Sequence, residues 1–142
     1  MPSARILALE YLRRQKLQKA RLQRKILRSS SDFLSQTDET FRYNFRLDKH
    51  TFIMVFHLIE EHIPKSSIPP LFQLATVLRF LAVGSFQRVI GKDSDLALSR
   101  TTVCKILWDV LPLMERILCP KFIKFDQTNE AILKPKTHFY NK

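Results

Sequence analysis

The residues best suited to chemistry lie between positions 99 and 105, where small and hydrogen-bonding side chains open an apolar-rich segment. At the start of a helix, such side chains can approach the base edges and phosphates of duplex DNA. Arginine can donate two hydrogen bonds to guanine, and threonine can meet a phosphate oxygen or a thymine methyl. The alternative is that residues 99–102 only cap a core helix. The candidate DNA-contacting residues are Ser99, Arg100, Thr101, Thr102 and Lys105, with Arg88 upstream as a phosphate ligand.

A helix is predicted to carry these residues. Ser99 is a favourable N-cap, and apolar residues follow it at helical spacing. Pro112 lies inside this run and removes one backbone hydrogen bond, so we expect the helix to kink or divide near Trp108–Asp109 and its second piece to end before Pro120. Residues 121–125 are expected to form a short strand or an aromatic latch. The predicted inner stripe is Val103, Ile106, Leu107, Val110, Leu111, Met114 and Leu118.

An apolar helix is predicted upstream of these residues. Pro69 and Pro70 suit its first turn, and Gly84 suits its C-cap. A short helix over Phe86–Ile90 and an irregular connector over residues 92–98 are expected to follow. This order of helix, short helix, connector and helix predicts a helix-turn-helix within residues 69–118. The expected inner face of the first helix is Leu71, Leu74, Ala75, Leu78, Leu81 and Ala82, widened by Val77 and Phe80.

The preceding segment predicts one further helix. Asp48 is a good N-cap for a helix that starts at Lys49 and ends before Pro64. In Phe41–Leu47, aromatic and polar residues alternate, which favours a short strand or an extended segment. Two histidines, His57 and His62, tempt a zinc interpretation, but they are five residues apart, whereas zinc-binding pairs on a helix are four apart. We therefore predict no metal site here, only a solvated face with a His57–Glu61 pair.

The N-terminal segment concentrates positive charge. The chain has a formal net charge of +11. Residues 1–28 are rich in helix formers, hold nine basic residues and one acidic residue, and place their leucines on no single stripe. We interpret them as a basic helical arm that binds phosphate or serves nuclear import and orders only with a partner; a solvated charged helix is the alternative. The basic arm residues are Arg13, Arg14, Lys16, Lys19, Arg21, Arg24 and Lys25.

Composition limits the remaining possibilities. The 142 residues suffice for one domain with a core, and two glycines disfavour an all-β fold or a phosphate-cradling loop. No apolar run is long enough to span a bilayer, so we expect no membrane partner. The predicted fold class is all-α: a small helical domain with a helix-turn-helix, preceded by a basic N-terminal helix or arm. The expected organisation is an arm over 1–28, a polar linker over 29–40, the helical domain over 41–125 and a tail over 126–142.

Several short motifs occur in order along the central segment. They are Arg79-Phe80, Gly84-Ser85-Phe86-Gln87, Ile90-Gly91 and Thr102-Val103-Cys104-Lys105, with Phe45-Arg46-Leu47 and Thr51-Phe52 upstream. Together they resemble the N-terminal region of the harbinger transposase-derived nucleases of the PIF/Harbinger group. The resemblance covers residues 41 to about 139.

The resemblance implies a nuclear protein that binds double-stranded DNA and has a Myb-like protein partner, with the cytoplasm as a second compartment. In that family, three acidic residues of a following domain bind a divalent metal, usually Mg²⁺, for strand cleavage. This sequence ends before the corresponding strand and offers no converging carboxylates. We therefore expect no catalytic residue, no metal and no cofactor in this chain. The alternatives are a protein-interaction module for a Myb-like partner, or the N-terminal fragment of a longer metal-dependent nuclease.

Overall fold

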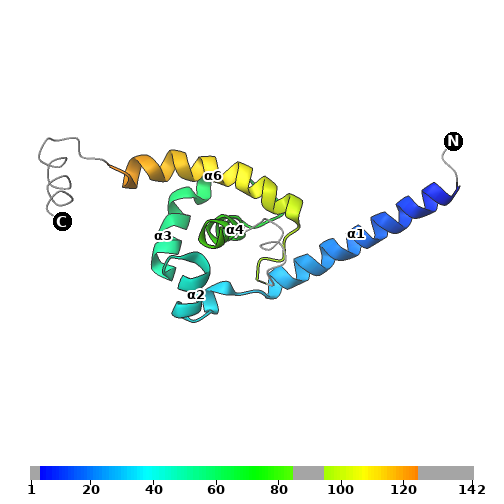
Figure 1. The fold of residues 1–142 in the computed structure, drawn as a ribbon, viewed down its shortest axis with the longest axis horizontal. Coiled ribbons are helices and arrows are strands. Elements are labelled where there is room, and N and C mark those ends of the chain that lie inside the picture. Colours follow the sequence, from blue (N-terminus) through cyan, green and yellow to red (C-terminus); the bar gives the residue numbers. More distant parts are fainter. Residues whose placement is uncertain (1–3, 85–94, 125–142) are drawn as a thin grey trace, which may run out of the picture.

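The computed structural model describes residues 4–84 and 95–124. These ranges contain helices and no strand, so the predicted all-helical class is confirmed. Figure 1 shows α4 between α6 on one side and α2 and α3 on the other, with α1 projecting away from this group. The elements are α1 (Ala4–Ser30), the 3₁₀ turn η1 (Phe33–Ser35), α2 (Asp38–Phe45), α3 (Lys49–Ile59), the 3₁₀ turn η2 (Glu60–His62), α4 (Pro70–Val83) and α6 (Arg100–Phe122).

Local signals set the ends of the central helix α4, as the sequence predicts. Pro70 occupies its first turn, where a missing N–H costs nothing. Gly84 ends it with a φ of +59°, a left-handed conformation that glycine adopts readily, and its N–H donates to the Phe80 carbonyl. The predicted inward position of Leu81 is wrong, because that side chain is 55% exposed. Burial is centred one turn earlier, on Gln73, Leu74, Ala75, Thr76, Val77 and Leu78.

Helix α3 also begins where predicted. Its N-cap Asp48 accepts a hydrogen bond of 2.7 Å from the Thr51 N–H. That backbone hydrogen bond is the main reason why the pKa of Asp48 lies below its usual value. The helix passes into η2 and both end before Pro64, in agreement with the expected limit.

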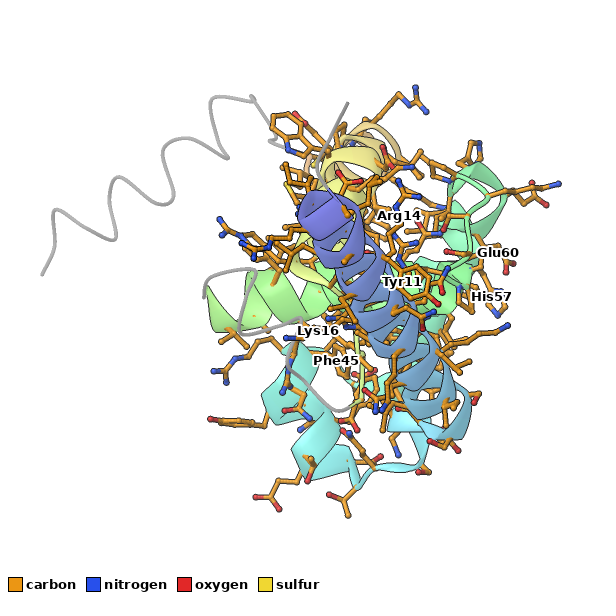
Figure 2. All side chains as sticks on the ribbon, turned by 90° about the vertical axis from the view of Figure 1, so that its right-hand side faces the viewer. Tyr11, Arg14, Lys16, Phe45, His57 and Glu60 are labelled. Atoms are coloured by element: carbon orange, nitrogen blue, oxygen red, sulfur yellow. The ribbon has the colours of Figure 1, made fainter. Side chains whose placement is uncertain are left out.

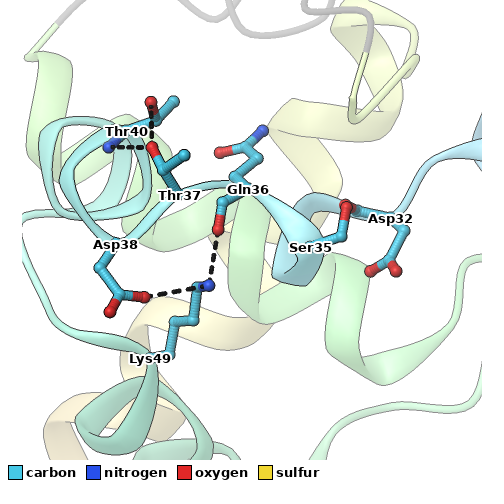
Figure 3. A network of polar contacts seen from close by, with 7 residues as sticks. All are labelled: Asp32, Ser35, Gln36, Thr37, Asp38, Thr40 and Lys49. Carbon is cyan, nitrogen blue, oxygen red and sulfur yellow. Dashed lines mark hydrogen bonds and ion pairs between the residues drawn. The ribbon is translucent and has the colours of Figure 1, made fainter.

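The segment before α3 differs from our expectation. Instead of a strand or extended segment, residues 41–45 belong to α2, because Thr37 accepts a hydrogen bond from the Thr40 N–H and so caps a helix. Figure 3 shows the polar contacts that hold this corner: Lys49 Nζ donates to the Gln36 carbonyl at 2.6 Å and lies 3.0 Å from Asp38 Oδ1.

The expected polar linker over residues 29–40 is likewise wrong for its second half. Phe33 is only 3% exposed and forms part of the core. It belongs to an aromatic cluster in which the centroids of contacting rings are 4.6–5.9 Å apart, and all six ring pairs have the tilted or edge-to-face arrangements that aromatic pairs prefer. Residues 33–40 are therefore part of the helical domain. The cluster consists of Phe33, Phe41, Phe45, Phe52 and Phe72.

Helix α6 is continuous, so of the expected kink or division at Pro112 the division is wrong, and the expected end before Pro120 is wrong as well. Pro112 lies on the exposed face, where its ring meets solvent and only one backbone hydrogen bond is lost. Buried residues on the opposite face hold both halves against the core. The helix continues to Phe122, so a strand is also wrong for the described part of 121–125. The buried residues of α6 are Val103, Ile106, Leu107, Val110 and Leu113, while Leu111, Met114 and Leu118 are half-buried.

The burial of Phe33 makes a testable prediction. Phe33→Ala should lower the free energy of unfolding by about 3 kcal/mol, because it leaves a cavity among packed rings. Urea unfolding followed by circular dichroism measures this change. Tyr43→Ala, at a 71% exposed aromatic position on α2, is the control and should change stability by no more than about 0.5 kcal/mol. Equal effects of the two substitutions would place Phe33 outside the core.

Candidate nucleic-acid interface

One face of α1 and the first turn of α6 enclose an open cleft of about 740 Å³. Figure 1 shows that the C-terminal part of α1 and the N-terminal end of α6 lie on the same side of the domain. Among the residues that the structure describes, four basic side chains and no acidic ones line this cleft. The polar and charged lining residues are Arg21, Arg24, Lys25, Arg28, Ser67, Ser99, Thr101 and Thr102; Leu17, Ile68 and Leu98 complete it.

The helical repeat of α1 decides which basic residues reach the cleft. Leu17, Arg21, Arg24 and Arg28 follow one another at intervals of three or four residues, so they share one face of the helix. Lys25 lies beside them. Figure 2 shows Arg14 and Lys16 on different sides of α1. The arm therefore has one face directed at α6. The remaining predicted arm residues, Arg13, Arg14, Lys16 and Lys19, are exposed and do not line the cleft.

Arg28 connects α1 to the segment that leads into α6. Its Nη1 donates a hydrogen bond of 2.8 Å to the carbonyl oxygen of Ala97, which is buried and has a positive φ of 43°. Burial lowers the pKa of Arg28 from its usual value, and the nearby charge of Arg24 lowers it further. A guanidinium remains charged at neutral pH despite such a shift. Arg28 thus contributes both a fixed contact and a positive charge.

The first turn of α6 contributes hydroxyl groups to the same cleft. Ser99 Oγ accepts a hydrogen bond of 3.2 Å from the Thr102 N–H, which confirms the predicted N-cap. The hydroxyl oxygens of Thr101 and Thr102 lie 3.0 and 2.7 Å from Ser99 Oγ. A helix N-terminus carries partial positive charge and attracts anions. The arrangement is chemically suited to a phosphate that is held by guanidinium groups on one side and hydroxyls on the other.

The other predicted residues occupy different places. Arg100 is exposed at the start of α6, and Lys105 is exposed one turn further along, outside the cleft. Arg88, as well as the predicted short helix Phe86–Ile90, lies outside the described residues. The arm is helical in the chain alone, whereas we expected it to order only with a partner.

Two polar residues that line the cleft, Arg28 and Ser67, were not among the predicted site residues. Arg28 lies four residues after Arg24 and so shares the helix face of Arg21 and Arg24. This spacing would have identified Arg28 if it had been known that this face is directed at the cleft. Ser67 gives no such signal, because it lies in the loop before α4 and reaches the cleft only through the tertiary fold.

In the described part of the chain, no three His, Cys, Asp or Glu residues gather where they could hold a metal ion. His57 and His62 do not converge on a site. His57 Nδ1 lies 3.0 Å from Glu60 Oε1, so the expected partner Glu61 is wrong by one residue. Within residues 4–84 and 95–124, no helix is both long enough and apolar enough to cross a bilayer.

Comparison with known proteins found no match among protein-family models, curated proteins or solved structures.

The contact between Arg28 and Ala97 makes a prediction about the arm. Arg28→Ala leaves a buried carbonyl without its donor and should lower the free energy of unfolding by about 1–3 kcal/mol. It should also speed amide hydrogen exchange over the last two turns of α1, which mass spectrometry can follow. Arg21→Ala, on the same face, is the control and should leave exchange nearly unchanged. Unaltered exchange in both variants would show that Arg28 does not hold the arm.

Proposed function

We propose that this chain is a non-catalytic protein that binds double-stranded DNA. The first turns of α6 approach a groove, and the basic face of α1 contacts the sugar–phosphate backbone. The observation that carries the proposal is the cleft in which Arg21, Arg24, Lys25 and Arg28 meet the N-terminal turn of α6. The architecture proposed for this part of the chain is a helix-turn-helix whose second helix is α6.

Electrostatics favours an anionic polymer as the ligand. Four basic side chains share one cleft whose described lining contains no acidic residue, so their mutual repulsion is relieved when phosphates enter. Binding of phosphates also releases counterions from DNA, which makes the affinity depend steeply on salt. The rest of α1 adds exposed basic residues that lengthen the same positive surface.

Base contacts are assigned to the exposed residues at the start of α6. Arg100 has the five guanidinium donors that suit guanine, and Thr101 offers a hydroxyl and a methyl group. Lys105 lies one turn on and suits a phosphate. The resemblance to harbinger-type transposases supports the same assignment, and with it a transposase-derived protein of the nucleus.

The cleft can be tested with variants matched in charge. Arg21→Gln, Arg24→Gln and Lys25→Gln in one chain should weaken duplex binding roughly 10- to 100-fold near 0.1 M salt and reduce the slope of log K against log salt by about 2–3. Fluorescence anisotropy with a labelled duplex at four or five salt concentrations gives both quantities. Glutamine keeps the helix propensity of α1 nearly intact.

The matched control removes the same charge from other faces of the same helix. Arg5→Gln, Lys16→Gln and Lys19→Gln should reduce the salt slope by less than half as much, because none of these residues lines the cleft. Equal losses would show that the arm acts only as a diffuse charge. A wild-type chain with no salt-dependent affinity for DNA would overturn the proposal.

Base recognition is tested separately at the start of α6. Arg100→Ala should cost roughly 1–3 kcal/mol on a preferred site, obtained by in-vitro selection, and less on random duplex. Competition binding with both duplexes measures the difference. Equal losses of affinity on the preferred site and on random duplex would show that Arg100 contacts the sugar–phosphate backbone of DNA and not a base.

A further inference from the structure

Helix α6 presents an unusually exposed tryptophan. Trp108 is 77% exposed, more than any other large hydrophobic residue in the described ranges. It stands beside an open apolar groove of about 340 Å³ formed with Phe80 of α4 and with Leu107, Leu111 and Pro112 of α6. A protruding aromatic ring next to an apolar groove is typical of a surface that docks another molecule.

Trp108 belongs to a stripe along the outer face of α6. Lys105, Trp108, Pro112 and Glu115 follow at intervals of three or four residues, so they share one side of the helix. All four are exposed, and this side lies opposite the buried residues of the same helix. None of the four is needed for the core.

The stripe has a symmetry that indicates its partner. Counted from Val110, Lys105 and Glu115 lie five residues away in opposite directions, and Trp108 and Pro112 lie two residues away. Two identical helices can pack antiparallel about a twofold axis at the level of Val110. Each residue then faces the residue of the other copy that lies equally far from Val110 in the opposite direction along the sequence. Lys105 then faces Glu115 of the second copy, and Trp108 faces Pro112 of the second copy. Each of these pairs occurs twice.

We propose that the outer face of α6 docks a second copy of this chain through an antiparallel α6–α6 contact, centred on the outer face at the level of Val110 along the helix. Charge complementarity favours a second copy as the partner, because Lys105 and Glu115 of one helix lie equally far from Val110 and so face residues of opposite charge on the other helix. The Trp108 ring of each copy covers Pro112 and the groove of the other. One helix pair buries less area than a standard interface, so the dimer is weak in solution.

The dimer also fits the proposed binding of DNA, although it does not depend on it. Arg100 lies ten residues from the axis, so the two copies of Arg100 are separated by about 30 Å along the helix pair, at a rise of about 1.5 Å per residue. Successive turns of a duplex are about 34 Å apart on one face. Two copies therefore present their α6 N-termini at nearly the spacing of two half-sites, and this part of the inference rests on the proposed function.

A charge-swap experiment on the full chain tests the contact without DNA. Sedimentation velocity from about 1 µM to about 1 mM should show a monomer–dimer equilibrium in the wild type. Lys105→Glu and Glu115→Lys should each weaken it at least about tenfold, since each places like charges opposite one another. The double variant should restore the dimer, because both ion pairs re-form with exchanged sign. Trp108→Ala should abolish it.

Controls exclude general effects of charge and aromatic content. Lys65→Glu and Tyr43→Ala change exposed residues outside α6 and should leave the equilibrium unchanged. Circular dichroism checks that every variant stays helical. A monomer at all concentrations, a dimer insensitive to Trp108→Ala, or no rescue in the double variant overturns the proposal. A rescued dimer in a chain that does not bind DNA leaves the α6–α6 contact standing and removes only the argument from half-site spacing.

Discussion

Two hydrogen bonds between distant segments determine how the charged surface is assembled. Arg28 donates to the Ala97 carbonyl, and Gln36 Nε2 donates to Asp95 Oδ2 at 2.7 Å, so the end of α1 and the residues after it are fixed to the chain just before α6. Without these contacts α1 would be a charged helix with no defined direction. With them, one face of the C-terminal half of α1 and the first turn of α6 line a common cleft.

The same corner is built from polar groups that support one another. The side chain of Gln36 accepts a hydrogen bond of 3.0 Å from Asn44 Nδ2 while it donates to Asp95, and its backbone carbonyl accepts from Lys49 Nζ. Behind this network lies the aromatic cluster, in which Phe33 contacts rings from α2, α3 and α4. Burial of Phe33 fixes the segment against the core, and the hydrogen bonds fix its direction. The position of the arm therefore depends on the packing of a residue that the sequence places in a polar stretch.

The features that could be predicted from sequence are the helix ends, because a few neighbouring residues determine each of them. The caps at Asp48 and Ser99, the proline at the start of α4 and the glycine at its end act within one turn, and the structure has all four. The failures depend on contacts made elsewhere in the chain. Phe41 and Tyr43 alternate with polar residues as in a strand, but Phe41 and Phe45 are also one helical turn apart, and packing on Phe52 selects the helix.

The candidate site shows the same limit. Ser99, Arg100, Thr101 and Thr102 were identifiable because a cap and its first turn are local. Arg21 and Arg24 line the cleft, whereas Lys16 and Lys19 do not. To predict this difference one must know the direction in which α1 leaves the domain, and no local sequence pattern gives that direction. Pro112 illustrates the converse. Its local cost is real, but apolar contacts on both sides of it outweigh one lost hydrogen bond.

A single continuous helix makes it possible for one element to serve two surfaces. Because α6 is not divided at Pro112, its exposed side runs unbroken from Thr101 at the cleft to Glu115 beyond the groove. Lys105 lies between the two surfaces, so the proposed dimer engages this lysine in both copies and withdraws one positive charge per copy from DNA while it joins two clefts. In the two proposals taken together, the position of Lys105 thus links assembly of the chain to its binding of DNA.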